Sequence, residues 1–191
     1  ESANAPLFSD SYVMVNNIPL EKKNLKTIRK NIGYVFQDAD SQLFMSTVFD
    51  DVAFAPRNYG MSEAEVNEKT MEALKVVHIE QLKDKQIYKL SGGEKKLASI
   101  ATILSTEPDV ILMDEPSVAL DPKNRRNLIN ILNRLNQAKI IASHDLNMIM
   151  DTCERTILLS DGKIIKDGNT KEILLDKELM EESGLELPLG Y

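Results

Sequence analysis

Short apolar runs alternate with longer amphipathic stretches along this chain. Residues 32–36, 110–113 and 139–142 are short runs rich in apolar residues, and polar residues follow each of them. Runs of this length predict buried β-strands. The stretches between them, such as residues 121–135, place apolar residues at helical spacing. Strands that alternate with helices predict an α/β fold with a mostly parallel sheet.

Three of the predicted helices begin with recognisable capping residues. Two begin with Ser followed three residues later by Glu, which is the spacing of a capping box. The third begins with Asp-Pro, where Asp caps the helix and Pro takes its first position. The helices predicted in this way are residues 62–77 (Ser62, Glu65), 91–105 (Ser91, Glu94) and 121–135 (Asp121, Pro122).

The remaining predicted elements are shorter. They are a strand at residues 12–15 before a turn at Asn16-Asn17, a helix at 25–30, two strands within 155–167 joined by Asp161-Gly162, and two short helices after Lys171.

Aromatic residues concentrate in one place. Residues 41–60 predict a helix that the chain leaves through Pro56, and they hold Phe44, Phe49, Phe54 and Tyr59 although aromatics make up only 5% of the chain. These side chains can form the core of a small helical subdomain, or a groove that receives a helix of a partner. The two interpretations are compatible.

Composition narrows the class of protein. At 191 residues the chain suits one domain, and no apolar run approaches the roughly 18 residues of a membrane span. The start of the sequence shows no signal-peptide pattern. The net charge of −7 argues against a nucleic-acid surface, and we interpret the basic cluster at residues 22–30 as the solvated face of a short helix. One cysteine and two histidines exclude an internal disulfide and a structural zinc site, which fits a reducing cytoplasm.

Two stretches carry candidate chemistry. Residues 90–94 read Leu-Ser-Gly-Gly-Glu at the start of a predicted helix, where free N–H groups and the helix dipole can bind phosphate oxygens. The predicted strand 110–113 ends in Asp114 and Glu115, which can deliver one carboxylate to a metal and the next to a water. Polar residues also follow the neighbouring strands, at Gln37 and at residues 143–145.

These motifs, in this order, resemble those of ABC-type ATPases. In chain order they are Gln37 as the Q-loop, residues 90–94 as the signature motif, 110–115 as Walker B, 117–121 as the D-loop and His144 as the switch histidine. The resemblance implies a P-loop NTPase-like fold with a helical subdomain, and hydrolysis of ATP with Mg²⁺ by a head-to-tail dimer.

The resemblance also implies a role for each site residue. Asp114 would hold Mg²⁺, and Gln37 would touch the metal or the water. Glu115 would orient and deprotonate the attacking water, and His144 would contact the γ-phosphate. The residues implied to bind ATP held by the second subunit, or to link the two sites, are Ser91, Gly92, Gly93 and Asp121.

Each of these residues also has a purely structural interpretation. Two acids after a strand can cap a helix or lie in an exposed turn. His144 can be a buried, hydrogen-bonded histidine, and Gln37 an ordinary amide at a strand end.

Local sequence is similar to the ATPase subunits of energy-coupling-factor importers, particularly the cobalt and nickel type. The similar stretches are residues 36–38, 41–44, 51–56 and 180–187. This similarity implies a second ATPase subunit, a transmembrane coupling subunit and a substrate-specific membrane subunit as partners, at the cytoplasmic face of the membrane. It implies no nucleic-acid partner.

Two features depart from the family pattern. Glu94 stands where the family usually has Gln, and the sequence contains no Gly-x-x-x-x-Gly-Lys-Ser/Thr P-loop; its one Gly-Lys is at Gly162. We therefore expect residues 1–191 to form a partial ABC ATPase domain without Walker A and its strands. Residues 38–105 would be the helical subdomain and 106–191 the remaining catalytic core. We expect this chain to be inactive alone, with strand 110–113 left with an unpaired edge.

Two other functions are compatible with the motifs. A truncated paralogue can act as a non-catalytic interaction module. A soluble ABC protein of DNA repair or translation is disfavoured, because the 53 residues between Gln37 and Ser91 leave no room for a long coiled coil and because the chain is acidic.

Overall fold

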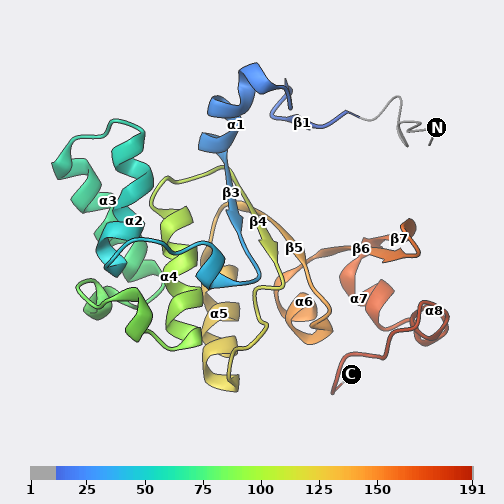
Figure 1. The fold of residues 1–191 in the computed structure, drawn as a ribbon. Helices are drawn as coiled ribbons and strands as arrows, with labels where there is room; N and C mark the ends of the chain where they lie inside the picture. The colour runs from blue at the N-terminus through green and yellow to red at the C-terminus, as the bar shows by residue number, and fades with distance from the viewer. Residues whose placement is uncertain (1–11, 191) are drawn as a thin grey trace, which may run out of the picture.

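The computed structural model describes residues 12–190, and its centre is a three-stranded parallel sheet (Figure 1). The strands of this sheet, in spatial order, are β3 (Ile32–Val35), β4 (Val110–Asp114) and β5 (Ala138–Ala142). Two antiparallel hairpins accompany it, β1 (Met14–Val15) with β2 (Ile18–Pro19) and β6 (Arg155–Ser160) with β7 (Lys163–Asn169). The predicted α/β fold is confirmed. Residues 1–11, where we noted no signal-peptide pattern, lie outside the described residues.

Eight α-helices are assigned within residues 12–190. They are α1 (Leu25–Asn31), α2 (Val48–Asn58), α3 (Glu63–Val76), α4 (Gly92–Leu104), α5 (Pro122–Arg134), α6 (Leu146–Thr152), α7 (Thr170–Leu174) and α8 (Lys177–Glu182). Figure 1 shows α2, α3 and α4 grouped on one side of the sheet, and the β6–β7 hairpin with α7 and α8 on the other. Helix α6 had not been predicted.

The predicted helix starts are confirmed in detail. Ser62 and Glu65 form a complete capping box at α3, and Ser91 and Glu94 form another at α4. Asp121 caps α5 by accepting two backbone N–H bonds, each 2.9 Å long. Local polar side chains therefore satisfy the first N–H groups of these helices, as their sequence predicted.

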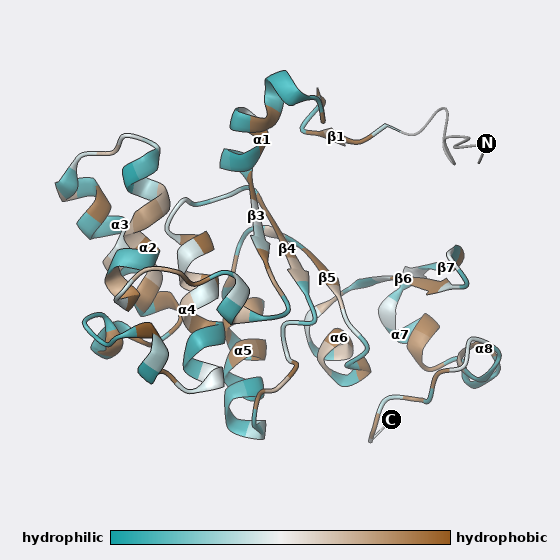
Figure 2. Cartoon of the chain, viewed as in Figure 1, coloured by the Kyte–Doolittle hydropathy of each residue, from teal (hydrophilic) through white to brown (hydrophobic). Residues whose placement is uncertain are grey.

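The core lies where the sheet meets α4 and α5. Ile111 of β4 and Leu128 and Leu132 of α5 are fully buried, and Val35 of β3 joins the same cluster. Figure 2 shows hydrophobic residues along β3 and β5, in agreement with the strand prediction. Gly33 in β3 allows α4 to approach, because a Cβ atom there would lie 1.9 Å from Cγ2 of Ile103.

Pro56 lies inside α2, so the prediction that the helix ends there is wrong. A proline has no N–H, which leaves the carbonyl of Val52 without its usual helical donor. The hydroxyl of Ser105 donates to that carbonyl at 2.9 Å, and Ser105 is buried. A tertiary hydrogen bond from the end of α4 thus replaces the missing helical bond and joins α2 to α4.

The aromatic residues of segment 41–60 are not core residues. Phe44 is 64% exposed and Phe54 39% exposed, and their rings pack edge to face with centroids 4.7 Å apart. Phe49 and Tyr59 are half-buried. Asp51 is buried and accepts N–H bonds from Phe44 and Met45, and burial raises the pKa of its carboxyl. Asp51 therefore fixes the loop that carries Phe44, and Phe44 packs against Phe54 of helix α2.

The expected unpaired edge of strand 110–113 is not found. β4 is the central strand, with β3 on one side and β5 on the other. The open edge belongs to β5, which pairs with β4 alone among residues 12–190. Residues 14–19 form the separate β1–β2 hairpin and do not extend the sheet. The prediction was wrong because β5 occupies the place beside β4.

None of the helices in residues 12–190 combines the length and the apolar character needed to cross a membrane.

Candidate active site at the carboxyl edge of the sheet

Parallel pairing brings the ends of three strands together. Val35 pairs with Met113, and Asp114 pairs with Ala142. Gln37, Glu115 and His144 follow these paired positions directly along the chain. They therefore come after neighbouring strands at one edge of the sheet, the edge at which α/β proteins bind ligands.

Glu115 is held in an unusual backbone conformation. Its φ is +43°, and its N–H donates to the carbonyl of Ala142 at 2.9 Å. Its carboxylate accepts a bond from the Ser143 hydroxyl at 3.0 Å and another from the His144 N–H at 3.0 Å. A positive φ in a non-glycine residue is strained, and such strain concentrates at functional sites. The carboxylate is thus fixed in place at the strand edge.

His144 contacts Glu115 through its ring. Nδ1 lies 2.7 Å from Oε1 of Glu115, and the imidazole side chain is 75% exposed. The hydrogen bond to this carboxylate raises the pKa of His144. With Nδ1 engaged, Nε2 remains to meet a ligand. The exposure of the ring contradicts the interpretation of His144 as a buried structural histidine.

Asp114 and Gln37 supply oxygen donors of the kind that Mg²⁺ prefers. Mg²⁺ in phosphoryl-transfer sites is held by one or two carboxylates together with water and substrate phosphates. A single carboxylate and an amide at the strand edge fit that requirement. Within residues 12–190 no cluster of three or more His, Cys, Asp or Glu could hold a metal by itself. Such a site would therefore depend on phosphate oxygens as well.

The signature residues lie at the start of α4 and are shaped by their neighbours. Ser91 and Gly92 are exposed, whereas Gly93 is buried. A Cβ atom on Gly93 would lie 2.5 Å from Nδ2 of Asn124, so any larger residue there would displace the Asn124 side chain. Asn124 is in turn held by Asp121 at 2.7 Å. The structure thus brings Gly93 and Asp121 together through Asn124.

The negative charge of Glu94 is compensated by its neighbours. It accepts the Ser91 N–H at 2.7 Å and pairs with Lys85 at 3.0 Å. The backbone bond from Ser91 and the charge of Lys85 lower the pKa of this carboxyl. The acid therefore acts as a helix cap with a paired charge.

The signature residues are separate from the strand-end group. Among the described residues no hydrogen bond joins residues 91–93 to the side chains of Gln37, Asp114, Glu115 or His144. The chain therefore carries two groups of site residues that are not hydrogen-bonded to each other.

A family model described as ABC transporter matches residues 7–118. A relative from Geobacter sulfurreducens is 46% identical over 178 residues, which cover 93% of this chain and 72% of the relative. The chain belongs to the ABC transporter family.

Other members of the ABC family are similar to this chain in sequence and in structure. The energy-coupling factor transporter ATP-binding protein EcfA of Carboxydothermus hydrogenoformans is 40% identical over 89% of this chain and 64% of its own length. The structure of cbiO1 from Clostridium perfringens, part of the ABC transporter complex cbiONQ, superposes with a TM-score of 0.79 at 36% identity. The superposition covers 88% of this chain and 70% of the cbiO1 chain.

A dimeric ABC cassette bound to ADP and Pi, MJ0796, superposes with a TM-score of 0.74 at 28% identity, covering 85% of this chain and 74% of that one. The chain thus spans about two thirds to three quarters of these relatives, and the ABC ATPase fold is confirmed.

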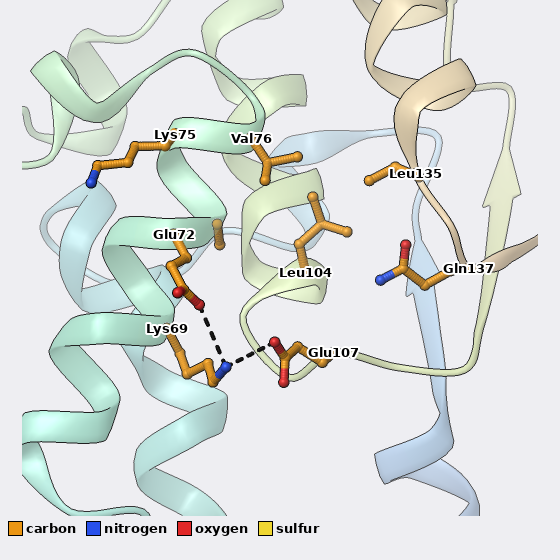
Figure 3. A pocket seen from close by; sticks show the side chains of 9 residues that line it. Lys69, Glu72, Lys75, Val76, Leu104, Glu107, Leu135 and Gln137 are labelled. Atoms are coloured by element: carbon orange, nitrogen blue, oxygen red, sulfur yellow. Dashed lines mark hydrogen bonds and ion pairs between the residues drawn. The ribbon is translucent and has the colours of Figure 1, made fainter.

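A cavity in this ABC protein lies away from the strand ends. It has a volume of about 380 Å³ and lies between α3, the end of α4 and the segments before β4 and β5 (Figure 3). Lys69 forms ion pairs at its rim with Glu107 at 2.8 Å and Glu72 at 3.4 Å. Because Glu107 and Gln137 precede their strands, the cavity lies at the amino edge of the sheet. The chemistry-bearing residues are at the opposite edge, so we place the site there.

Sequence reasoning missed the residues that support Glu115 and His144. Ser143 donates to Glu115 and accepts the N–H of Asp145 at 3.1 Å. Asp145 forms a two-bond ion pair with Arg125 of α5, at 2.6 and 2.7 Å. These bonds lower the pKa of Asp145 from 3.8 to about 2, with the Arg125 bond as the largest cause. The available signal was Asp145 itself, a residue of the helix-capping type beside His144.

Because the pKa of Asp145 falls to about 2, we expect the bonds of its carboxylate, of which the Arg125 pair is the largest, to stabilise the fold by about 2 kcal/mol in total. Because the folded pKa is depressed, this contribution is complete above about pH 4 and is lost as the pH falls toward about 2. Asp145→Asn keeps a capping side chain and should lose about that much at neutral pH, as measured by urea unfolding. The loss should shrink as the pH is lowered from about 5 to about 3.

Asp167→Asn is the matched control. Asp167 makes a similar two-bond pair with Arg155, but the Arg155 side chain is 71% exposed. An exposed pair contributes about 0 to 1 kcal/mol. Equal losses in the two variants, or a loss in Asp145→Asn that does not change with pH, would contradict a role for the Arg125 pair.

Proposed function

We propose that this chain forms the hydrolytic part of the ATP-binding subunit of an energy-coupling-factor importer for cobalt, nickel or another micronutrient. The observation that carries the proposal is the fixed carboxylate of Glu115, bonded to Ser143 and His144 beside Asp114. The EcfA and cbiO1 similarities support the importer type. Residues 38–105 would act as the helical subdomain and 106–191 as the rest of the catalytic core.

In this proposal each strand-end residue has one task. Asp114 and Gln37 would hold Mg²⁺, which would neutralise negative charge on the phosphates. Glu115 orients the attacking water and accepts its proton. His144 keeps its ring in place through Glu115 and presents Nε2 to the γ-phosphate. Ser143 holds the Glu115 carboxylate in position for this step.

The signature residues serve a second subunit. Ser91 and Gly92 are exposed at the start of α4, where the helix dipole favours phosphate, and they are not bonded to the strand-end group. We propose that residues 91–93 contact ATP held by the facing subunit of a head-to-tail dimer, and that Asp121 links the two sites. The dimeric form of MJ0796 supports this arrangement.

The absence of a P-loop motif from the 191 residues leads us to propose that this chain alone does not hydrolyse ATP. The alternative function, a non-catalytic interaction module, also predicts that the chain alone does not hydrolyse ATP. ATPase activity of a subunit that contains both this segment and a P-loop would support the hydrolytic function, since an interaction module would remain inactive.

Glu115→Gln tests the catalytic assignment. In an ATP-hydrolysing subunit that contains residues 1–191, we expect turnover to fall by about 10²-fold or more, because the amide cannot accept the proton. Binding of ATP should be retained, because the amide keeps the shape of the side chain. Steady-state phosphate release and equilibrium nucleotide binding measure the two effects. Near-normal turnover would remove Glu115 from the mechanism.

We further propose that the pair Phe44 and Phe54 receives a cytoplasmic helix of the transmembrane coupling subunit. Both side chains of the pair are exposed, and Asp50, one helical turn before Phe54 in α2, is only part-buried. An apolar patch with acidic neighbours suits an amphipathic, partly basic helix. We propose on this basis that the subunit works at the cytoplasmic face of the membrane.

Phe54→Asp should weaken assembly with a coupling subunit by about tenfold or more, because a charge then replaces apolar contact area. Co-purification and titration with the coupling subunit in detergent measure the effect. Tyr88→Asp is the control, since Tyr88 is an aromatic residue outside this patch and, at 73% exposed, is even more accessible to solvent than Phe54. Unchanged assembly by a folded Phe54→Asp protein would exclude the patch as the docking site.

A further inference from the structure

Three side-chain links bind the segment after β3 to helix α4. We name residues 36–43 the Q-segment. The links are Lys96 to the carbonyls of Phe36 and Gln37 at 2.9 and 2.6 Å, Lys95 to Asp40 at 2.5 Å, and Gln42 to the Ser99 carbonyl at 2.7 Å and the Thr102 hydroxyl at 2.8 Å. The Q-segment is therefore attached to one face of α4 along about two turns.

Lys96 is the most unusual of the three links. It is 3% exposed, and a buried ammonium group is costly unless its charge is compensated by polar partners. Its partners are two consecutive backbone carbonyls, one of which belongs to Gln37. Burial lowers the pKa of Lys96. The negative charges of Asp38 and Asp114 act in the opposite direction and favour the charged ammonium. The ammonium thus lies between α4, the Q-segment and the end of β4.

Gln42 completes the attachment from the other end of the Q-segment. Its Nε2 donates twice to α4, while its Oε1 accepts the backbone N–H of Phe36 at 3.1 Å. Phe36 is therefore fixed at both its N–H and its carbonyl by side chains that are also anchored on α4. The backbone that carries Gln37 takes its position from the helix.

We propose that Lys96 and Gln42 are positioning residues that make Gln37 and the signature residues move as one unit. Lys96 lies one helical turn after Gly92 and Gly93, so α4 joins the two sites by a short rigid path. When residues 91–93 meet nucleotide on a facing subunit, Gln37 is carried with them. This inference rests on the proposed role of Gln37, but the mechanical link itself does not.

The link can be measured on the 191-residue chain without nucleotide. The amide of Phe36 is bonded to Gln42 and reports on the Q-segment, whereas the amide of buried Ile111 in β4 reports on global unfolding. In Lys96→Met, which keeps the apolar stem and removes the ammonium, we expect hydrogen exchange at Phe36 to rise at least tenfold. Exchange at Ile111 should stay unchanged, as read by NMR.

Lys95→Met is the matched control, because Lys95 is the neighbouring lysine and makes a more exposed ion pair with Asp40, whose side chain is 62% exposed. It should leave Phe36 exchange within about twofold of the parent chain. Equal acceleration at Phe36 and Ile111 in Lys96→Met would show a purely structural role and overturn the proposal. So would unchanged exchange at Phe36. If Lys96→Met does not fold, Gln42→Leu replaces it, with exchange read at Ser41 and Leu43, whose N–H groups are bonded to carbonyls inside the Q-segment.

A kinetic readout separates this inference from the proposed function. In an ATP-hydrolysing subunit containing this chain, Lys96→Met should lower kcat at least tenfold and leave KM for ATP nearly unchanged. An equal change in KM would overturn the positioning role. If Glu115→Gln retains turnover while Lys96→Met still loosens Phe36, the link stands and the catalytic assignment fails.

Discussion

The parallel pairing of β4 between β3 and β5 is the constraint on which the site depends. The register sets Val35 beside Met113 and Asp114 beside Ala142, so residues just after the three strands share one edge. A slip of one residue would turn Ile111 and Met113 away from the core, because side chains alternate across a strand. Burial of these apolar side chains therefore also fixes where Gln37, Asp114 and His144 lie.

Helix α4 connects that sheet to the rest of the molecule through close contacts. Gly33 lets the helix approach β3, Ser105 satisfies the carbonyl that Pro56 leaves free in α2, and Gly93 admits Asn124 of α5. Each contact depends on a small residue or on one hydroxyl. The helix is thus positioned by contacts at its start and at its end, and it carries the signature residues at its first turn.

Local sequence was sufficient to predict the strands, the capped helices and the residues at the strand ends. Capping boxes and short apolar runs depend on neighbours a few residues away, so Ser62 or Ser91 could be interpreted without a structure. That Pro56 lies inside a helix could not be predicted from neighbouring residues, since the helix tolerates this proline through a hydrogen bond from Ser105, which is far away in sequence. The same holds for the Arg125–Asp145 pair and for Lys96, whose partners are brought together only by folding.

The central claim is that the sheet edge supplies the hydrolytic half of an ATP site and that strong phosphate binding requires a P-loop outside these motifs. A P-loop contributes several N–H bonds and a lysine, and charge-assisted bonds contribute about 1.5 to 3 kcal/mol each. Millimolar to micromolar affinity corresponds to only about −4 to −8 kcal/mol, so losing three such bonds would remove most of it.

Calorimetric titration of the 191-residue chain with Mg-ATP tests this most directly. The account predicts no measurable saturation below about 1 mM. A dissociation constant below roughly 100 μM, near −5.5 kcal/mol, would contradict it.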